Sequence, residues 1–263
     1  MTQTYFLHIP KTAGTSFVAI LNRHFSSDEI SPYSLLDRVA ELIDKGEKEE
    51  LNKYPLIQGH LGYSVIKYLG EAPQIITMLR DPIERTISLF NHIKREESHW
   101  MHKDISPEAT IEEFLSYPPA RNLVCNFQIC NIAMDFDLSK EFKNKNGDIL
   151  GKNQGSLLAE AVDIEDKQDE KLLDIAKDRL EKFTFVGITE EFEKSIKLLE
   201  KIMGWEVAGN IPTENVSPKT SMSKENLSKE TLEDIRSLTK LDQEIYEFAK
   251  DIFEKRFEKE FKN

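Results

Sequence analysis

An apolar segment followed by a polar, glycine-containing turn opens the chain and constrains its fold more than any other feature. The run TYFLHI over residues 4–9 predicts a strand, and the turn PKTAGT occupies residues 10–15. Apolar residues then recur at helical spacing over residues 16–25, which predicts a helix. Strand, tight turn and helix in this order are typical of a unit in which the helix covers one face of a sheet.

The same alternation continues along the chain and predicts a single α/β domain over residues 1–263. The run QIITMLR over residues 74–80 is apolar almost throughout, as in a strand covered on both faces. Two further strands are predicted over residues 54–60 and 183–188. Helical patterns lie between and after the strands, over residues 35–43, 82–94, 111–117, 121–133, 170–182, 189–204 and 228–253. We expect a central parallel sheet of about four to five strands flanked by helices.

Composition limits the classes of function. The chain has 47 acidic residues against 35 lysines and arginines, a formal net charge of −12, which disfavours non-specific binding of nucleic acid. The two cysteines, Cys125 and Cys130, cannot form a disulfide framework and indicate a reducing compartment. No apolar run approaches the roughly 20 residues of a membrane span, so a cytoplasmic protein is expected.

The turn after the first strand is a candidate anion site. A helix N-terminus carries unsatisfied N–H groups and partial positive charge, and Gly14 lets a ligand approach the backbone closely. Lys11 adds a full charge, and Thr12, Thr15 and Ser16 add hydroxyl donors. The order of Lys and Gly differs from the G-x-x-x-x-G-K-[ST] pattern of nucleotide kinases. An ordinary strand-to-helix turn with a capping hydroxyl is the alternative.

A second candidate anion site follows the strand at 74–80. Arg80 ends that strand at the edge where α/β proteins bind ligands, Ser88 lies two turns into the next helix, and Arg85 is nearby. The alternative is that Arg80 pairs with Asp81 or Glu84 and that Ser88 is an exposed surface residue. Two such sites on neighbouring strand ends would suit a nucleotide that carries phosphates at both ends of its ribose.

The two motifs together resemble a known family. FLHIPKTAGTSF followed by ITMLRDPIERTISLF is similar to the PAPS-dependent sulfotransferases, specifically the carbohydrate, heparan sulfate 2-O-type branch of sulfotransferase family 2. Weaker similarity extends to IQGH, NFQICNIA, the strand and helix of residues 180–199, NVSPKTS and LDQEIYEFA. The resemblance covers most of the chain outside residues 137–168, and it implies a P-loop-like domain.

The resemblance implies roles for individual residues. The first loop would hold the 5′-phosphosulfate of PAPS, with Lys11 stabilising the leaving phosphate and His60 acting as the general base. Arg80 and Ser88 would hold the 3′-phosphate, and Lys219 and Thr220 would close over the donor. The expected donor-binding set is therefore Lys11, Thr12, Ala13, Gly14, Thr15, Ser16, Arg80, Ser88, Lys219 and Thr220.

Other polar residues near these motifs have less specific interpretations. Asn126 and Gln128 either orient the substrate or make packing hydrogen bonds, and His8 is expected to pack beside the loop. The spacing of three histidines does not complete a ligand set with the nearby glutamates, so no metal is expected; they are His92, His99 and His102.

The acceptor is less constrained by the sequence. The acidic chain favours a sugar or another small alcohol over a polyanion, and residues 137–170 are predicted to be a flexible insertion that carries acceptor specificity. The oligomeric state stays open. Two alternatives for function are a P-loop-type small-molecule kinase that uses ATP and a non-catalytic nucleotide-binding protein of the same fold.

Overall fold

A computed structural model of the chain describes residues 2–32, 35, 39–135, 166–205 and 222–261. Its centre is a four-stranded parallel sheet in the order β2-β1-β3-β4. The strands are β1 (Thr4–Leu7), β2 (Leu56–Gly59), β3 (Gln74–Leu79) and β4 (Phe185–Ile188). Thr4 is in register with Leu56 on one side and with Gln74 on the other, which places β1 between β2 and β3. The predicted α/β fold is confirmed.

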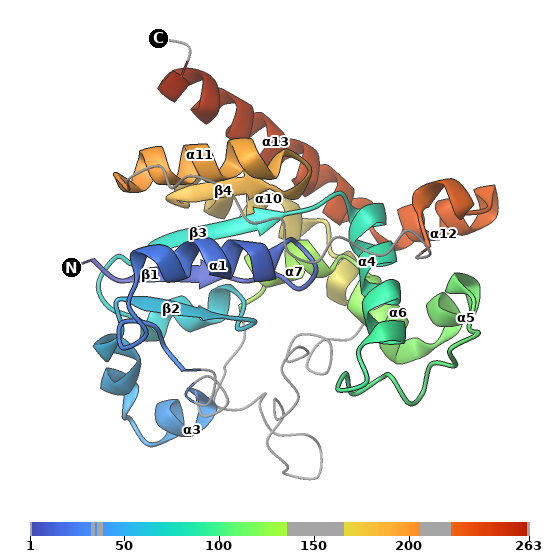
Figure 1. Cartoon of the computed structure of the whole chain (residues 1–263), viewed down its shortest axis with the longest axis horizontal. Coiled ribbons are helices and arrows are strands. Elements are labelled where there is room, and N and C mark those ends of the chain that lie inside the picture. The colour runs from blue at the N-terminus through green and yellow to red at the C-terminus, as the bar shows by residue number, and fades with distance from the viewer. Residues whose placement is uncertain (1, 33–34, 36–38, 136–165, 206–221, 262–263) are drawn as a thin grey trace.

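Helices cover the sheet (Figure 1). Helix α1 lies in front of the strands, α7 and α10 lie behind them, and α11 and α13 pack against β4. The helices are α1 (Gly14–His24), α3 (Val39–Asp44), α4 (Pro82–Arg95), α5 (Ile111–Ser116), α6 (Pro118–Val124), α7 (Phe127–Ala133), α10 (Lys171–Lys182), α11 (Phe192–Met203), α12 (Lys229–Leu238) and α13 (Lys240–Phe261). All residues of β1, β2 and β4 are buried, as expected of parallel strands covered on both faces.

The helix predicted over residues 121–133 is in fact two helices, α6 and α7. The break lies at Asn126, whose backbone is left-handed with a φ of 43°. Its side-chain oxygen accepts the backbone N–H of Leu241 at 3.0 Å, and its amide donates to the Lys167 carbonyl at 2.9 Å. Asn tolerates this conformation better than most residues, and the side chain then satisfies backbone groups of two other segments. Asn126 therefore has the packing role that was the alternative to orienting a substrate.

The helix predicted from Thr189 begins later. Thr189–Glu191 form a 3₁₀ turn and α11 starts at Phe192. The Thr189 hydroxyl is buried and has no hydrogen-bond partner in the part of the chain that the structure describes. Gly204 ends α11 in the left-handed conformation, with a φ of 68°, as predicted. The predicted C-terminal helix is broken once, at Thr239, between α12 and α13.

Three further predictions concern the cysteines, the insertion and membrane-spanning helices. Cys125 and Cys130 are buried free thiols. Of the predicted insertion at 137–170 the structure describes only its end, where Asp166–Gln168 form a 3₁₀ turn and Lys167 is buried. Among the described residues, no helix combines the length and the hydropathy needed to cross a bilayer.

Candidate active site

Three predicted site residues follow three adjacent strands at the same edge of the sheet. The loop of Lys11 follows β1, His60 follows β2 and Arg80 follows β3. Because these strands are parallel, their carboxyl ends meet on one side of the molecule (Figure 1). The first strand is central among the three, so its loop lies between the histidine and the arginine.

The loop between β1 and α1 has an uncommon backbone. Lys11 and Ala13 both have positive φ angles, of 71° and 63°, although neither is glycine. The Thr12 hydroxyl, which is buried, donates to the Ile9 carbonyl at 2.8 Å and holds the turn closed. Such residues cost about 1–3 kcal/mol each and persist where the surroundings enforce them, often at ligand sites. Thr12 is therefore a residue that shapes the loop, while Thr15 is exposed on the first turn of α1.

Gly14 is required by the packing of His8. A Cβ atom at position 14 would lie 1.6 Å from Nε2 of His8, far inside any permitted contact. The His8 ring stacks on Phe6 with ring centroids 4.9 Å apart and lies 4.2 Å from the ring of His60. His8 thus packs between the start of α1 and the candidate base, as expected of a residue beside the loop.

The hydrogen bond of His60 fixes which of its nitrogens can act as a base. Nδ1 lies 2.7 Å from the backbone carbonyl of His8, and a carbonyl oxygen can only accept, so Nδ1 carries the proton in the neutral ring. Burial, and the nearby charge of Lys11, lower the pKa of His60. The ring is then neutral at pH 7, and its Nε2 lone pair is available to accept a proton.

Lys11 lies in a strongly cationic environment. Burial lowers its pKa to about 8, and repulsion from Arg95, Arg80 and Arg85 adds to the effect. Glu96 is the nearby charge that opposes this shift. A cation whose charged form is disfavoured in the free protein gains most when an anion binds next to it. The loop therefore has the electrostatics of an anion site.

Arg80 is attached to the same loop. Its guanidinium donates to the Lys11 carbonyl at 3.2 Å. The buried side chain of Gln128 holds its backbone from both directions, accepting the Arg80 N–H at 2.9 Å and donating to the Arg80 carbonyl at 2.8 Å. The two candidate anion sites are thus brought together, and Gln128 positions the second one. The sequence pointed to Gln128 but did not predict this pair of hydrogen bonds to the Arg80 backbone, which we call the Gln128 clamp.

Helix α4 presents a polar stripe to the loop. Arg85, Ser88, His92 and Arg95 recur at spacings of three, four and three residues, which places them along one helix face. Arg85 is buried, with bonds to the Pro10 carbonyl at 3.4 Å and the Leu123 carbonyl at 2.6 Å. Its role is therefore structural. The Ser88 hydroxyl, half-buried one turn further on, has no hydrogen-bond partner in the described part of the chain.

Two histidines that the sequence analysis did not assign to the site lie close to it: His92 in the stripe and His99 after the end of α4. Burial lowers the pKa of His92 to about 4, and repulsion from Lys11 contributes to this shift. Burial and repulsion from Lys11 also lower the pKa of His99. The two rings are in contact, with centroids 5.6 Å apart. The helical spacing from Ser88 to His92 and Arg95 was the signal that could have found them.

Other predictions fall outside this cluster. Lys219 and Thr220 lie outside the described residues. Within the described ranges no group of three or more His, Cys, Asp or Glu side chains is arranged to hold a metal ion. His102 differs from the other two histidines in its contacts, because its Nδ1 lies 2.7 Å from the backbone carbonyl of Ile93.

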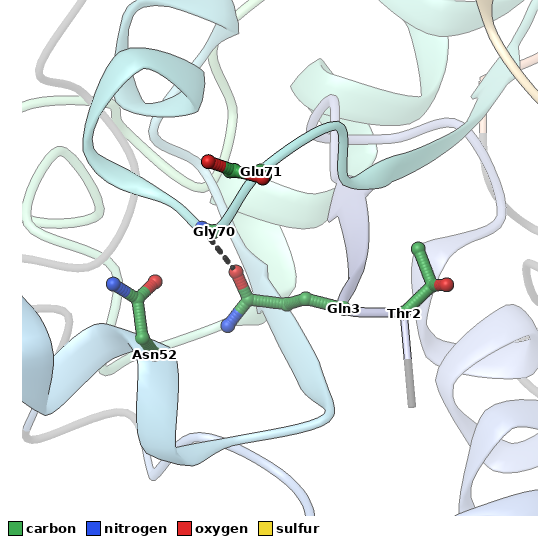
Figure 2. Close-up of a pocket in the computed structure, with 5 residues that line it drawn as sticks. All are labelled: Thr2, Gln3, Asn52, Gly70 and Glu71. Atoms are coloured by element: carbon green, nitrogen blue, oxygen red, sulfur yellow. Dashed lines mark hydrogen bonds between the residues drawn. The ribbon is translucent and has the colours of Figure 1, made fainter.

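A polar pocket lies at the opposite edge of the sheet (Figure 2). Its lining is Thr2, Gln3, Asn52, Gly70 and Glu71, beside the amino end of β1. The Gln3 amide donates to the carbonyls of Leu51 and Tyr54, each at 2.9 Å, and its oxygen accepts the Gly70 N–H at 3.0 Å. This side chain joins three segments, and the pocket lies at the edge of the sheet opposite to Lys11, His60 and Arg80, so it is not the candidate active site.

Comparison with known proteins identifies the family. A family model described as "Sulfotransferase family" matches residues 3–258. The chain belongs to this family. Heparan-sulfate 6-O-sulfotransferase 2 of Gallus gallus is 27% identical over 195 residues, which cover 70% of this chain and 45% of that protein. Heparan-sulfate 6-O-sulfotransferase 1 of Homo sapiens is 27% identical over 203 residues, which cover 70% of this chain and 44% of that protein.

These matches refine the predictions made from the sequence. The chain spans less than half the length of the curated relatives it matches. Membership of the sulfotransferase family is confirmed, whereas the assignment to the heparan sulfate 2-O type is not: the similar proteins are 6-O-sulfotransferases. These matches give no support to the kinase alternative.

Proposed function

We propose that the chain transfers the sulfuryl group of PAPS to a hydroxyl group of a sugar. The observation that carries this proposal is the convergence of Lys11, His60 and Arg80 at three adjacent strand ends, with the Arg80 guanidinium bonded to the Lys11 carbonyl. The names of the similar proteins support a carbohydrate acceptor and, more specifically, a 6-hydroxyl.

The donor would be bound at its two ends. The backbone N–H groups at the start of α1 and the side chains of Lys11, Thr15 and Ser16 suit the 5′-phosphosulfate. Arg80 and the hydroxyl of Ser88, which has no partner among the described residues, suit the 3′-phosphate. The low pKa of Lys11 supports this arrangement, because a bound phosphosulfate would restore the favourable charge of the ammonium group. We extend the proposal to Lys219 and Thr220, which would complete the donor site.

The reaction then needs one proton acceptor and one cation. The acceptor hydroxyl oxygen forms a bond to sulfur while the bond from sulfur to the bridging phosphate oxygen breaks. The hydroxyl proton goes to Nε2 of His60, and the charge that develops on the leaving 5′-phosphate is stabilised by Lys11. The product nucleotide is 3′-phosphoadenosine 5′-phosphate (PAP). No metal ion has a role in this proposal.

The acceptor and the location of the enzyme follow less directly. We propose a sugar acceptor of low charge, because the chain carries a net charge of −12. A cytoplasmic location, a single domain over residues 1–263 and acceptor specificity in residues 137–170 remain parts of the proposal.

The direct test is transfer of labelled sulfate from PAPS to a panel of acceptors. The panel would contain neutral sugars, desulfated heparan oligosaccharides and sulfated ones, with ATP and Mg²⁺ as a parallel donor. We expect a labelled sugar with PAPS, loss of product in both Lys11→Ala and His60→Ala, and donor binding retained in His60→Ala. Lys53→Ala is the matched control, because Lys53 is exposed and pairs with Glu50 far from the loop.

Three results would count against the proposal. Phosphate transfer from ATP without sulfate transfer from PAPS would favour the kinase alternative. Normal turnover in His60→Ala would remove His60 from the mechanism, whereas donor binding without turnover on any acceptor would favour the non-catalytic alternative.

A further inference from the structure

Glu190 lies beside the candidate 3′-phosphate contact and has no role in the proposal above. It follows β4, the strand next to β3, so the parallel sheet brings it to the same edge as Arg80. One carboxylate oxygen of Glu190 is 3.9 Å from Nε of Arg80. Neither residue is fully exposed: the side chains of Arg80 and Glu190 are 24% and 34% exposed. The pair is therefore partly shielded from solvent.

The carboxylate of Glu190 is held in place from two other elements. Oε1 accepts the backbone N–H of Asp81 at 3.1 Å, directly after Arg80 in the chain. Oε2 accepts the hydroxyl of Tyr246, in α13, at 2.8 Å. A long side chain fixed at both oxygens can orient a partner, whereas a solvated surface glutamate cannot.

Arg80 in turn is held on three sides. Gln128 binds its backbone, one guanidinium nitrogen donates to the Lys11 carbonyl, and Glu190 lies beside Nε. Its Nε is buried and has no hydrogen-bond partner within the described residues. The contact with Glu190 is thus electrostatic and not a hydrogen bond, and it leaves the guanidinium oriented while donor capacity remains for a ligand.

We propose that Glu190 is a positioning residue that orients the Arg80 guanidinium for the 3′-phosphate of the donor nucleotide. Tyr246 and the Asp81 N–H hold Glu190, Glu190 orients Arg80, and Arg80 connects the 3′-phosphate contact to the loop of Lys11. This inference rests on the proposed function, because it uses the 3′-phosphate as the ligand of Arg80. The inference also concerns ligand selectivity: the preference of the protein for nucleotides with a 3′-phosphate depends on Glu190, although Glu190 does not contact the nucleotide.

The test compares the affinities of PAP and AMP for the full chain by titration calorimetry. The two nucleotides differ by the 3′-phosphate, so the ratio of their affinities reports on Arg80, while the AMP affinity reports on the rest of the site. We expect Glu190→Ala to lower the ratio about tenfold, within the range of couplings found inside one polar network, and to leave the AMP affinity within about twofold. Glu190→Gln removes the charge and keeps one oxygen, which can still accept the Asp81 N–H, while its amide can donate to the Tyr246 hydroxyl oxygen, so it should fold and lose a smaller part of the ratio.

A matched control and a double variant complete the experiment. Glu191 is the next residue in the chain and pairs with Lys194 at 2.9 Å, so Glu191→Ala removes a neighbouring carboxylate and should not change the ratio. In an Arg80→Ala background, Glu190→Ala should have no further effect on the ratio. Additive effects, an unchanged ratio in both Glu190 variants, or an equal loss of PAP and AMP affinity would each overturn the inference. If the unmodified protein does not prefer PAP to AMP, the proposed function itself fails, which separates the two failures.

Discussion

Substitution of Gly14 by alanine tests how the loop, His8 and His60 depend on each other. The added Cβ would lie 1.6 Å from Nε2, 2.4 Å from Cε1 and 2.5 Å from Cδ2 of His8, so the whole ring must move. Stacking on Phe6 and contact with His60 leave the ring little room to do so. Overpacking of this kind costs about 1–3 kcal/mol, and we expect the upper part of that range.

The backbone of Gly14 does not add to this cost. Its φ is not positive, so alanine is allowed there and, near a helix start, would gain up to about 1 kcal/mol from helix propensity. The net loss of stability is then about 2 kcal/mol, which for a chain of this size lowers the melting temperature by about 4–8 °C. PAP affinity should fall as well, because the displaced ring and the start of α1 both border the loop.

Thermal melts and PAP titration would measure both effects. Gly70→Ala is the matched control, since a Cβ there has no neighbour closer than 3.7 Å. In a His8→Ala background the Gly14 substitution should cost less than it does alone, because the clashing ring is absent. A Gly14→Ala protein that melts at the temperature of the unmodified one and binds PAP normally would refute this account of the loop.

Three further predictions concern other contacts of the site. Gln128→Ala should lower the free energy of unfolding by about 2–4 kcal/mol in urea titration, because it leaves the buried N–H and carbonyl of Arg80 without partners; a loss under 0.5 kcal/mol would contradict the clamp. The pKa of Lys11 is lowered to about 8 in the fold, so the unfolded chain binds more protons between pH 8 and the ordinary lysine pKa near 10.5, and this group makes the free energy of unfolding rise with pH in that range. Lys11→Met should remove this part of the pH dependence of stability, and an unchanged pH dependence would argue against the lowered pKa. Ser88→Ala should weaken PAP about fivefold, as expected for one hydrogen bond, and leave AMP binding unchanged, and equal effects on both would place Ser88 elsewhere.

Local sequence patterns predicted the elements that carry the site. The helix predicted over residues 82–94 is α4, which begins at Pro82, and the Asp81 side chain before it accepts the N–H groups of Ile83 and Glu84. The strand, turn and helix around Lys11 were predictable because each is determined by neighbours in the chain. The alternation of strands and helices also predicted a parallel sheet, and the strand order seen in the structure brings Lys11, His60 and Arg80 together.

Contacts between distant segments could not be predicted in the same way. Gln128 is 48 residues from the backbone that it holds, and Glu190 is 109 residues from Asp81. No local sequence pattern relates these residues to their partners, since the contacts depend on how α7 packs on the sheet and on the position of β4 beside β3. The break at Asn126 was missed for a similar reason, because it is stabilised by hydrogen bonds to Lys167 and α13.

The affinity of the full chain for PAP, measured against AMP in the same buffer, tests the central claim most directly. If Arg80 and Ser88 bind the 3′-phosphate while the loop of Lys11 binds the 5′-phosphate, charge-assisted hydrogen bonds worth about 1.5–3 kcal/mol should make PAP bind about 10- to 100-fold more tightly than AMP. The same preference should be lost in Arg80→Ala. Equal affinities for the two nucleotides would contradict a doubly anchored donor and, with it, the proposed sulfuryl transfer.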